Sequence, residues 1–323
     1  MDIALSDFAG LIKFAVEHGV GLVVPGPEGV LVDGIADAFK KVGISVFGPS
    51  RLASRIEGSK AFSKDFMKRW EIPSAAHSTF TDYESSSKYL RSVDPTSVVI
   101  KASGLAAGKG VVLPGSMAEA LDALQGLHTS GNVVIEERLT GPELSILAFS
   151  DGHSYALMPP AQDHKRALDG DLGLNTGGMG AYAPAPLATP SLISSIAEIA
   201  IQRAIDGMRK EGFPFIGVLY AGVILTPAGP QVLEYNCRFG DPEAQAILPL
   251  LSDSCDLAQI CLAAANGHLD SVNVEFKKGY SASVVAASHG YPGPYSTGCR
   301  IVMGRDMPPG KPLFYVPFPL CSL

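Results

Sequence analysis

The pattern of apolar positions over residues 1–49 predicts alternating helices and strands. Apolar residues recur at helical spacing over 5–16 and again over 31–42, where Gly43 would end the second helix. Two short apolar runs, at 20–24 and 44–47, have the length and composition of buried strands. A helix–strand–helix–strand order is typical of a parallel sheet. Because this segment begins with a helix, we expect it to be the back half of an open α/β domain.

The pattern changes after residue 50. One long helix is expected over 51–70, and further helices begin at Asp82 and at Ser116, where Glu119 completes the spacing of a capping box. Strands are expected at 77–80, 97–102, 111–113, 133–137 and 143–149. Such alternation within a compact region indicates an α+β unit.

The second half of the chain opens with a long polar segment. Residues 159–186 are rich in glycine and proline and are too long for an idle connection, so we interpret them as a functional loop. A helix over 191–210 follows. Two strands, 216–225 and 231–236, are then joined by a turn that predicts a hairpin, and apolar helices follow over 243–266.

Composition excludes several classes of protein. Hydrophobic residues make up 46% of the 323 residues, which is enough for the cores of two or three domains. The net charge is −7 and no basic run is present, so nucleic acid is not an expected partner. No apolar stretch has the length of a membrane span. The five cysteines lack C-x-x-C spacing, which favours reduced thiols and a cytoplasmic location.

A glycine-rich loop connects two of the predicted strands. The segment from Lys101 to Gly110 cannot be a Walker A loop, because Gly110 stands where that motif has Ser or Thr. A glycine loop between strands can instead fold over phosphates and donate backbone N–H groups. Lys101 could then pair with phosphate oxygens. The alternative is a glycine-rich hairpin with a solvated lysine.

Carboxylates cluster at the ends of two other strands. Glu136 and Glu137 end an apolar strand whose edge could bind an adenine ring, although paired glutamates on a strand are also typical of a solvated face. Glu234 and Asn236 share one face of their strand, and carboxylate and amide oxygens suit Mg²⁺. Arg238 and Asp241 follow at once. Burying so many polar groups without a function would be costly, although an ion-paired turn is the alternative.

The long polar segment contributes further candidates. Lys165 and Arg166 suit a phosphate or an acyl phosphate. Asn175 and Thr176 lie among glycines that permit close backbone contact. His164 is better explained by a structural or substrate-positioning role than as a general base. The sequence offers no Ser/His/Asp or Cys/His arrangement that would support covalent hydrolase chemistry.

Together these segments resemble the phosphoribosylamine–glycine ligases of purine synthesis, also called glycinamide ribonucleotide synthetases. The matches include Gly26 to Glu28, Glu57 to Phe62, Lys101 to Gly110, Gln162 to Arg166, Asn175 to Tyr182 and Glu234 to Glu243. The resemblance implies an ATP-grasp fold, mixed α/β and α+β, in which two lobes clamp ATP. It also implies a partial parallel α/β domain before that fold.

The resemblance implies three domains. They are a partial N-terminal α/β domain at 1–58, an ATP-grasp domain at 59–268 with a flexible lid over about 75–148, and a partial C-terminal domain at 269–323 that diverges after about 310.

The implied reaction is the ATP-dependent ligation of glycine to 5-phosphoribosylamine through glycyl phosphate, on the route to IMP. Residues implied to bind ATP are Lys60, Lys101, Gly104, Gly108, Lys109, Gly110, Glu136, Glu137, Leu139 and Glu143. Glu234 and Asn236 would hold Mg²⁺ or Mn²⁺. Catalytic roles are implied for Arg238, Lys165 and Asp163, and substrate contacts for Arg166, Asn175, Thr176, Gly178 and Asp241.

The sequence also departs from the family pattern. The family begins with a strand and a Gly-x-Gly-Gly-Arg-Glu-His turn, and Met1 of this sequence corresponds to a position after that turn. At the other end, the match stops after about residue 310. We therefore expect a form truncated at both ends, whose alternative function is ATP binding without catalysis. An ATP-grasp enzyme for another carboxylate is disfavoured by the Asn175 to Tyr182 match. Fusion to other purine-pathway domains is a further expectation.

Overall fold

An antiparallel sheet forms the centre of the body of the molecule. The computed structural model describes residues 3–106, 110–296, 298, 300 and 314. The central sheet has the strand order β14-β13-β7-β8. Its strands are β7 (Glu143–Asp151), β8 (Tyr155–Leu157), β13 (Ile216–Thr226) and β14 (Gly229–Asn236). The hairpin predicted between the last two strands is confirmed by their antiparallel pairing.

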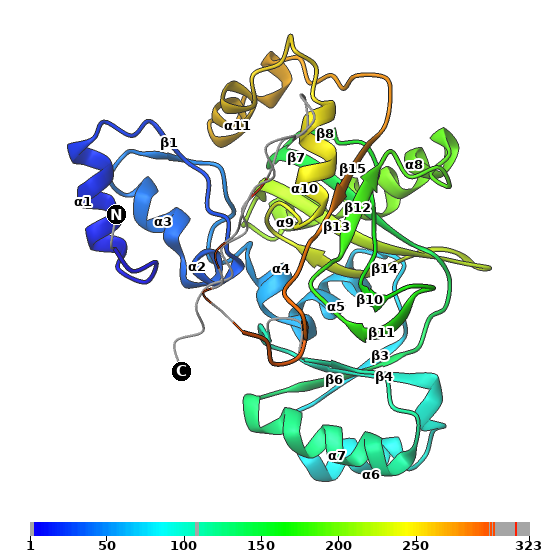
Figure 1. Ribbon diagram of the computed structural model, residues 1–323. Helices are drawn as coiled ribbons and strands as arrows, with labels where there is room; N and C mark the ends of the chain where they lie inside the picture. The colour runs from blue at the N-terminus through cyan, green and yellow to red at the C-terminus, as the bar shows by residue number, and fades with distance from the viewer. Residues whose placement is uncertain (1–2, 107–109, 297, 299, 301–313, 315–323) are drawn as a thin grey trace.

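Helices cover both faces of this sheet (Figure 1). Ile146 of β7 packs on the side of α8 and α9, while Phe149 packs on the side of α10 and α11. Burial on both faces explains why the middle of β7, from Ile146 to Phe149, is continuously apolar instead of alternating. The helices are α8 (Pro190–Ile196), α9 (Arg203–Lys210), α10 (Glu243–Ile247) and α11 (Leu257–Ala265), and short 3₁₀ turns cover Leu248–Leu250 and Leu269–Ser271. A π-helical segment, Ala197–Gln202, joins α8 to α9.

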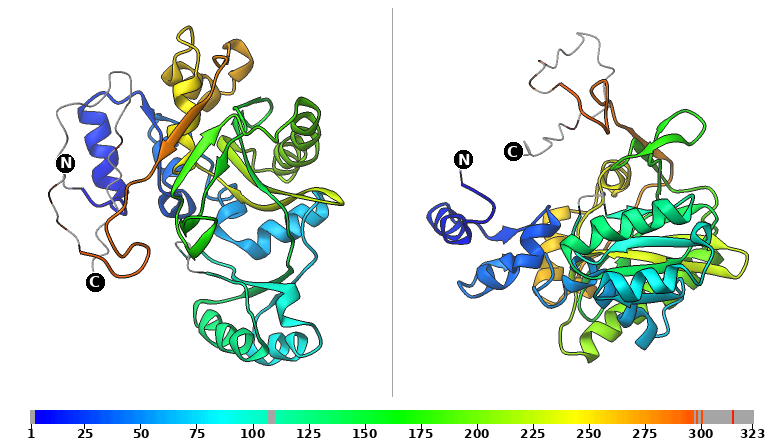
Figure 2. Two further views of the ribbon diagram at one scale, coloured as in Figure 1. Left: turned by 45° about the vertical axis from the view of Figure 1, so that its right-hand side comes forward. Right: turned by 90° about the horizontal axis from the view of Figure 1, so that it is seen from below.

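The N-terminal unit lies to one side of the body, as both views of Figure 2 show. It contains α1 (Phe8–Glu17), β1 (Leu22–Val23), α2 (Glu28–Asp33), α3 (Ile35–Lys40) and β2 (Ser45–Val46). The predicted parallel pairing is confirmed, since Leu22 aligns with Ser45. The single helix expected over 31–42 is wrong. Gly34 adopts φ +97°, a left-handed conformation that ends α2 before α3 begins.

The helix expected over 51–70 is also interrupted. The structure has α4 (Arg55–Gly58) and α5 (Lys60–Arg69), separated by Ser59 in an extended conformation. The Ser59 hydroxyl accepts a hydrogen bond from the backbone N–H of Phe62, so this residue caps α5. Lys60 therefore stands at the first position of a helix instead of in the middle of one.

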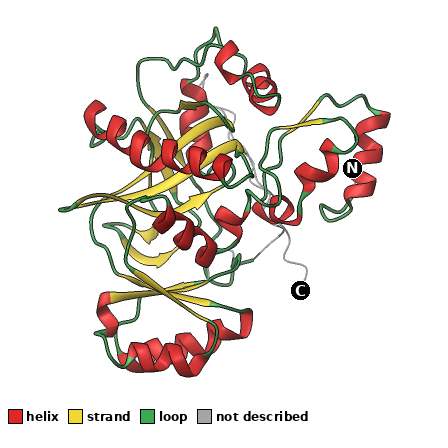
Figure 3. Ribbon diagram, turned by 180° about the vertical axis from the view of Figure 1, so that it is seen from behind, coloured by secondary structure: helices red, strands yellow, loops and turns green. Residues whose placement is uncertain are grey.

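A second sheet forms a separate lobe, the lid, at the bottom of Figure 1. Its order is β3-β6-β4-β5, with β3 (His77–Phe80), β4 (Val98–Ala102), β5 (Val111–Val112) and β6 (Val133–Glu137). Helices α6 (Tyr83–Leu90) and α7 (Met117–Leu127) cover its outer face, as seen from behind in Figure 3, and 3₁₀ turns span Pro95–Ser97 and His128–Ser130. Ser116 caps α7 as predicted, but the Glu119 carboxylate accepts from the N–H of Gly115.

The segment expected to be one long loop contains four short strands. These are β9 (Gln162–Asp163), β10 (Arg166–Leu168), β11 (Leu172–Asn175) and β12 (Gly180–Ala183). Strand β12 lies between β9 and β15 (Ser281–Val284), whereas β10 and β11 form a hairpin of their own. Within the described residues, no helix combines the length and apolar character needed to cross a membrane.

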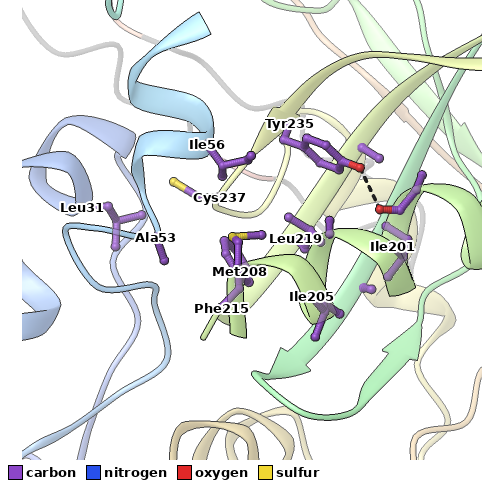
Figure 4. Packing of buried hydrophobic residues seen from close by; sticks show 14 of the residues in the cluster. Leu31, Ala53, Ile56, Ile201, Ile205, Met208, Phe215, Leu219, Tyr235 and Cys237 are labelled. Carbon is purple, nitrogen blue, oxygen red and sulfur yellow. Dashed lines mark hydrogen bonds between the residues drawn. The ribbon is translucent and has the colours of Figure 1, made fainter. Parts of the chain in front are cut away.

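A buried tyrosine ties the π-helical segment to the sheet. Tyr235 of β14 donates a hydrogen bond of 2.7 Å to the backbone carbonyl of Ala200 (Figure 4). Tyr235→Phe should lower the free energy of unfolding by about 1–2 kcal/mol, because a buried carbonyl loses its donor. Chemical denaturation measures this. Tyr280→Phe, at a tyrosine that is 81% exposed, is the matched control. Equal midpoints for the two variants would contradict the prediction.

Candidate functional site

Strand alternation places two charged residues on the inner face of the lid. Ile100 and Ile135 pack toward α6 and α7 in the core of the lid. Lys101 and Glu136, the next residues of β4 and β6, therefore point to the opposite face, toward the body. The apolar pattern of these strands is thus the reason that both side chains enter the space between the lobes.

The Glu136 carboxylate binds two lysines. Its Oε2 atom lies 3.0 Å from Nζ of Lys101 and 3.0 Å from Nζ of Lys64, which comes from α5. Lys64 also donates to the hydroxyl of Ser74 at 3.2 Å. Lys64 and Glu136 are each only 2% exposed, and among the described residues Oε1 of Glu136 has no hydrogen-bond partner. Sequence reasoning missed Lys64, although its spacing of four from Lys60 puts both on one helix face.

Glu234 lies within the electrostatic influence of several cations. It flanks the buried Tyr235 on β14, and Asn236 flanks the same residue from the other side. Burial alone would raise the pKa of Glu234, but the positive charges of Lys101, Lys165 and Lys60 outweigh this and lower the pKa. The lysines come from β4, from the connection between β9 and β10, and from α5. The fold thus brings predicted ATP, catalytic and metal residues to one place.

Arg238 is held by two carboxylates that sequence reasoning did not single out. Its Nε lies 3.3 Å from Glu28 Oε2, and its second terminal nitrogen lies 3.2 Å from Glu57 Oε1. The other oxygen of Glu57 accepts the N–H of Cys237 at 2.7 Å. Burial raises the pKa of Glu57 despite the nearby Arg238. These contacts join the N-terminal unit to the end of β14.

A second acidic cluster surrounds Asp163. Burial and the neighbouring Glu243 raise the pKa of Asp163 to about 7, against the opposing effect of Lys165. Its Oδ1 atom has no hydrogen-bond partner among the described residues. Glu243 is buried and accepts hydrogen bonds from the hydroxyls of Tyr220 at 2.6 Å and Ser145 at 3.1 Å. Glu243 was not among the predicted site residues.

Gly178 forms one wall of this cluster. Its φ of +131° is favourable only for glycine, and a Cβ atom there would lie 2.4 Å from Pro242 Cδ and 2.9 Å from Asp163 Oδ1. A side chain at this position would therefore displace the acidic cluster. This close backbone approach explains the glycine at position 178.

The remaining predicted substrate residues are more dispersed. Lys165 Nζ lies 3.3 Å from Glu143 Oε2, and Thr176 bonds to the backbone carbonyl of Lys165. Arg166 and Asn175 are exposed on the β10–β11 hairpin, where Arg166 bonds to the carbonyl of Gly173. Asp241 is exposed and accepts from the side chain of Gln245, apart from the lysine cluster.

The predicted adenine-binding segment borders a pocket. Glu137 and Leu139 line a hollow of about 360 Å³ between the lid connections and the tip of the β13–β14 hairpin. Lys101, Glu136 and Glu234 are not in its lining. In the covering loop, Gly104 is exposed and Gly110 is buried, whereas Gly108 and Lys109 lie outside the described residues. The described residues contain no group of three or more His, Cys, Asp or Glu placed to hold a metal.

Comparison with known proteins identifies the family. Residues 58–244 match the family model described as "Phosphoribosylglycinamide synthetase, ATP-grasp (A) domain", and residues 1–57 match that of the N domain of the same synthetase. The chain belongs to the phosphoribosylglycinamide synthetase family. A phosphoribosylamine–glycine ligase of Rhodopirellula baltica is 44% identical, with 93% of this chain and 71% of the relative covered.

Solved structures support the same family and its ATP-grasp fold. The crystal structure of phosphoribosylamine–glycine ligase from Thermotoga maritima is 32% identical with a TM-score of 0.74, covering 93% of this chain and 83% of that one. A biotin carboxylase domain from Hydrogenobacter thermophilus, 18% identical with a TM-score of 0.68, shares the fold, with 87% of this chain and 62% of that one covered.

Longer relatives are also similar. A bifunctional purine biosynthetic protein of Schizosaccharomyces pombe is 53% identical over 92% of this chain and 38% of its own length. The chain thus spans about two fifths of such fungal relatives of the synthetase family.

The pKa of Asp163 predicts a pH dependence of stability. Because folding raises this pKa from the ordinary value of 3.8 to about 7, the folded state favours the neutral acid. The associated stability is present below pH ~4 and is lost as pH rises through about 7. Asp163→Asn should therefore match the wild type at low pH and exceed it by roughly 1–4 kcal/mol at pH ~8.

Denaturation curves recorded across this pH range measure the effect. Asp169→Asn, which removes an exposed carboxylate from the same segment, controls for the change in net charge. Parallel stability profiles for Asp163→Asn and the wild type would argue against the assignment.

Proposed function

We propose that this chain binds ATP with a divalent cation between lid and body and joins glycine to 5-phosphoribosylamine. The observation that supports this most directly is the positive charge that Lys60, Lys101 and Lys165, from three separate segments, exert together on Glu234. Lysines gathered in a sheltered space are suited to a polyphosphate. Membership of the synthetase family supplies the choice of substrates.

The nucleotide would lie against both lobes. Lys60 and Lys101 would contact its phosphates, and the loop from Gly104 to Gly110 would cover them. The backbone of Glu137 and Leu139 would meet the adenine ring, with Glu143 near the ribose. Oε1 of Glu136, an acceptor without a donor, is also suited to an amino group of the base.

Glu234 and Asn236 would hold the cation. A carboxylate and an amide oxygen at alternate positions of β14 are hard oxygen ligands, and the lowered pKa keeps Glu234 ionised. Two protein ligands are too few alone, so phosphate oxygens would complete the set. When bound, the cation neutralises phosphate charge. We propose Mg²⁺, the metal that accompanies ADP in the Hydrogenobacter carboxylase structure, and Mn²⁺ as a substitute.

The chain's own residues fit the two chemical steps. The glycine carboxylate attacks the γ-phosphorus and ADP leaves, and the amine of phosphoribosylamine then attacks the glycyl carbon and phosphate leaves. Asp163, with a pKa of about 7, can accept the proton that the amine loses. Lys165 and Arg238 would stabilise negative charge at the reacting groups. We assign substrate contacts to Arg166, Asn175, Thr176, Gly178 and Asp241.

The cellular setting belongs to the same proposal. Relatives named bifunctional or trifunctional purine biosynthetic proteins, including those of Schizosaccharomyces pombe and Gallus gallus, carry this region as part of a longer polypeptide. We propose that this chain serves the route to IMP in the cytoplasm, joined to other purine-pathway domains.

Phosphate release tests the function. The purified chain should release phosphate only when ATP, Mg²⁺, glycine and freshly generated phosphoribosylamine are all present, and omission of any one gives the control. Nucleotide binding by calorimetry without phosphate release would instead establish an ATP-binding protein without catalysis. Release with a different carboxylic acid, but not with glycine, would indicate another ATP-grasp activity.

Substitutions test the placement of the nucleotide and metal. Lys101→Ala should weaken ATP binding by ~1.5–3 kcal/mol, because a charge-assisted contact to phosphate is lost. Glu234→Ala should weaken only the part of ATP binding that depends on the metal, which titration with and without Mg²⁺ or Mn²⁺ separates. Unchanged affinity in both variants would mean that the site lies elsewhere.

A further inference from the structure

The pair of lysines on Glu136 has an unusual charge balance. Two ammonium groups and one carboxylate meet at a single oxygen, with both distances 3.0 Å. Lys64, Lys101 and Glu136 are 2%, 7% and 2% exposed, so water screens them little. The formal charge of the trio is +1. A charge in such a place is costly unless an anion lies near it, and Glu234 of the body, which acts on both lysines, is one such anion.

The two lysines differ in what else they can reach. Lys64 is buried. Its ammonium group forms an ion pair with Glu136 and donates a hydrogen bond to the hydroxyl of Ser74. The charges of both lysines act on Glu234 in the body, but Lys101 lies on the inner face of the lid and is not bonded to Ser74. An approaching phosphate would therefore meet Lys101 and would not meet Lys64.

We propose that Lys64 is a positioning residue that neutralises Glu136 and thereby leaves the charge of Lys101 for the phosphates of the nucleotide. This rests on the proposed function. If position 64 were apolar, Lys101 and Glu136 would form a neutral pair. The carboxylate of Glu136 would then neutralise the charge of Lys101, and less of that charge would act on the phosphates. Lys64 thus acts through Glu136, across the junction of body and lid, without touching the ligand.

The charge balance separates this role from a merely structural one. Lys64→Met changes the formal charge of the trio from +1 to 0, whereas Lys64→Arg keeps it at +1. Adding Glu136→Gln to Lys64→Met restores +1 and keeps an oxygen acceptor at position 136. If Lys64 were needed only for packing, adding Glu136→Gln to Lys64→Met would not restore nucleotide binding.

Calorimetric titration of the full chain with MgADP is the first test. Lys64→Met should raise the Kd about tenfold or more, which is the size of one charge-assisted contact. Lys64→Arg should stay within about threefold, and Lys64→Met with Glu136→Gln should return to within about threefold of Glu136→Gln alone. Lys68→Met, at an exposed lysine of α5, is the matched control. Unchanged affinity in Lys64→Met, or no recovery with Glu136→Gln, would overturn the proposal.

A second test needs no nucleotide. If both lysines neutralise Glu136, combining Lys64→Met with Lys101→Met leaves the buried Glu136 carboxylate without a positive partner. The double variant should then lose more Tm than the sum of the single variants, by about 5 °C or more. Glu136→Gln in the double variant should restore most of this loss. If the Tm losses of the two single variants simply added up in the double variant, the idea that both lysines neutralise Glu136 would be overturned. Failure of wild type to bind MgADP would instead refute the proposed function, and the Tm comparison would still decide the charge sharing.

Discussion

The arrangement of the molecule depends on the pairing of β13 with β7. The two strands are paired from Glu143 and Ile224 at one end to Asp151 and Ile216 at the other. Strand β13 also pairs with β14, so Gly222 stands between Ser145 on one side and Glu234 on the other. The sheet therefore fixes how far the Glu243 cluster lies from the lysines around Glu234. Because helices bury both faces of the sheet, neither cluster can shift without disturbing a core.

The elements of the fold could largely be predicted from the sequence, because local rules determine them. Alternation in the lid strands and the 3.6-residue period of α1 and α7 are visible in single segments. The failures arose where one residue overrides a periodic pattern. Gly34 adopts a left-handed conformation and Ser59 an extended one, and each divides what the apolar spacing presents as one helix.

The candidate site could be predicted only in part. Glu234 and Asn236 could be proposed from the sequence because their spacing on one strand is itself the signal. Lys64, Glu57 and Glu243 were not among the predicted site residues, because the contacts that place each of them in the site are made with residues distant in the sequence. Lys64, for example, looks like an ordinary helix lysine until Glu136 is brought to 3.0 Å from it. Pairing between lobes is a property of the tertiary structure, and no local pattern contains it.

The break at Ser59 has a mechanical consequence. The backbone N–H groups of Lys60 and Ala61, at the start of α5, have no acceptor within the helix. They donate instead to Ser103, which follows lid strand β4: Lys60 to its carbonyl at 2.7 Å and Ala61 to its hydroxyl at 3.1 Å. A residue of one lobe thus completes the hydrogen bonding of a helix in the other. An outward movement of Ser103 would leave these two amides without acceptors, so moving this part of the lid away from the body would cost two hydrogen bonds at the start of α5.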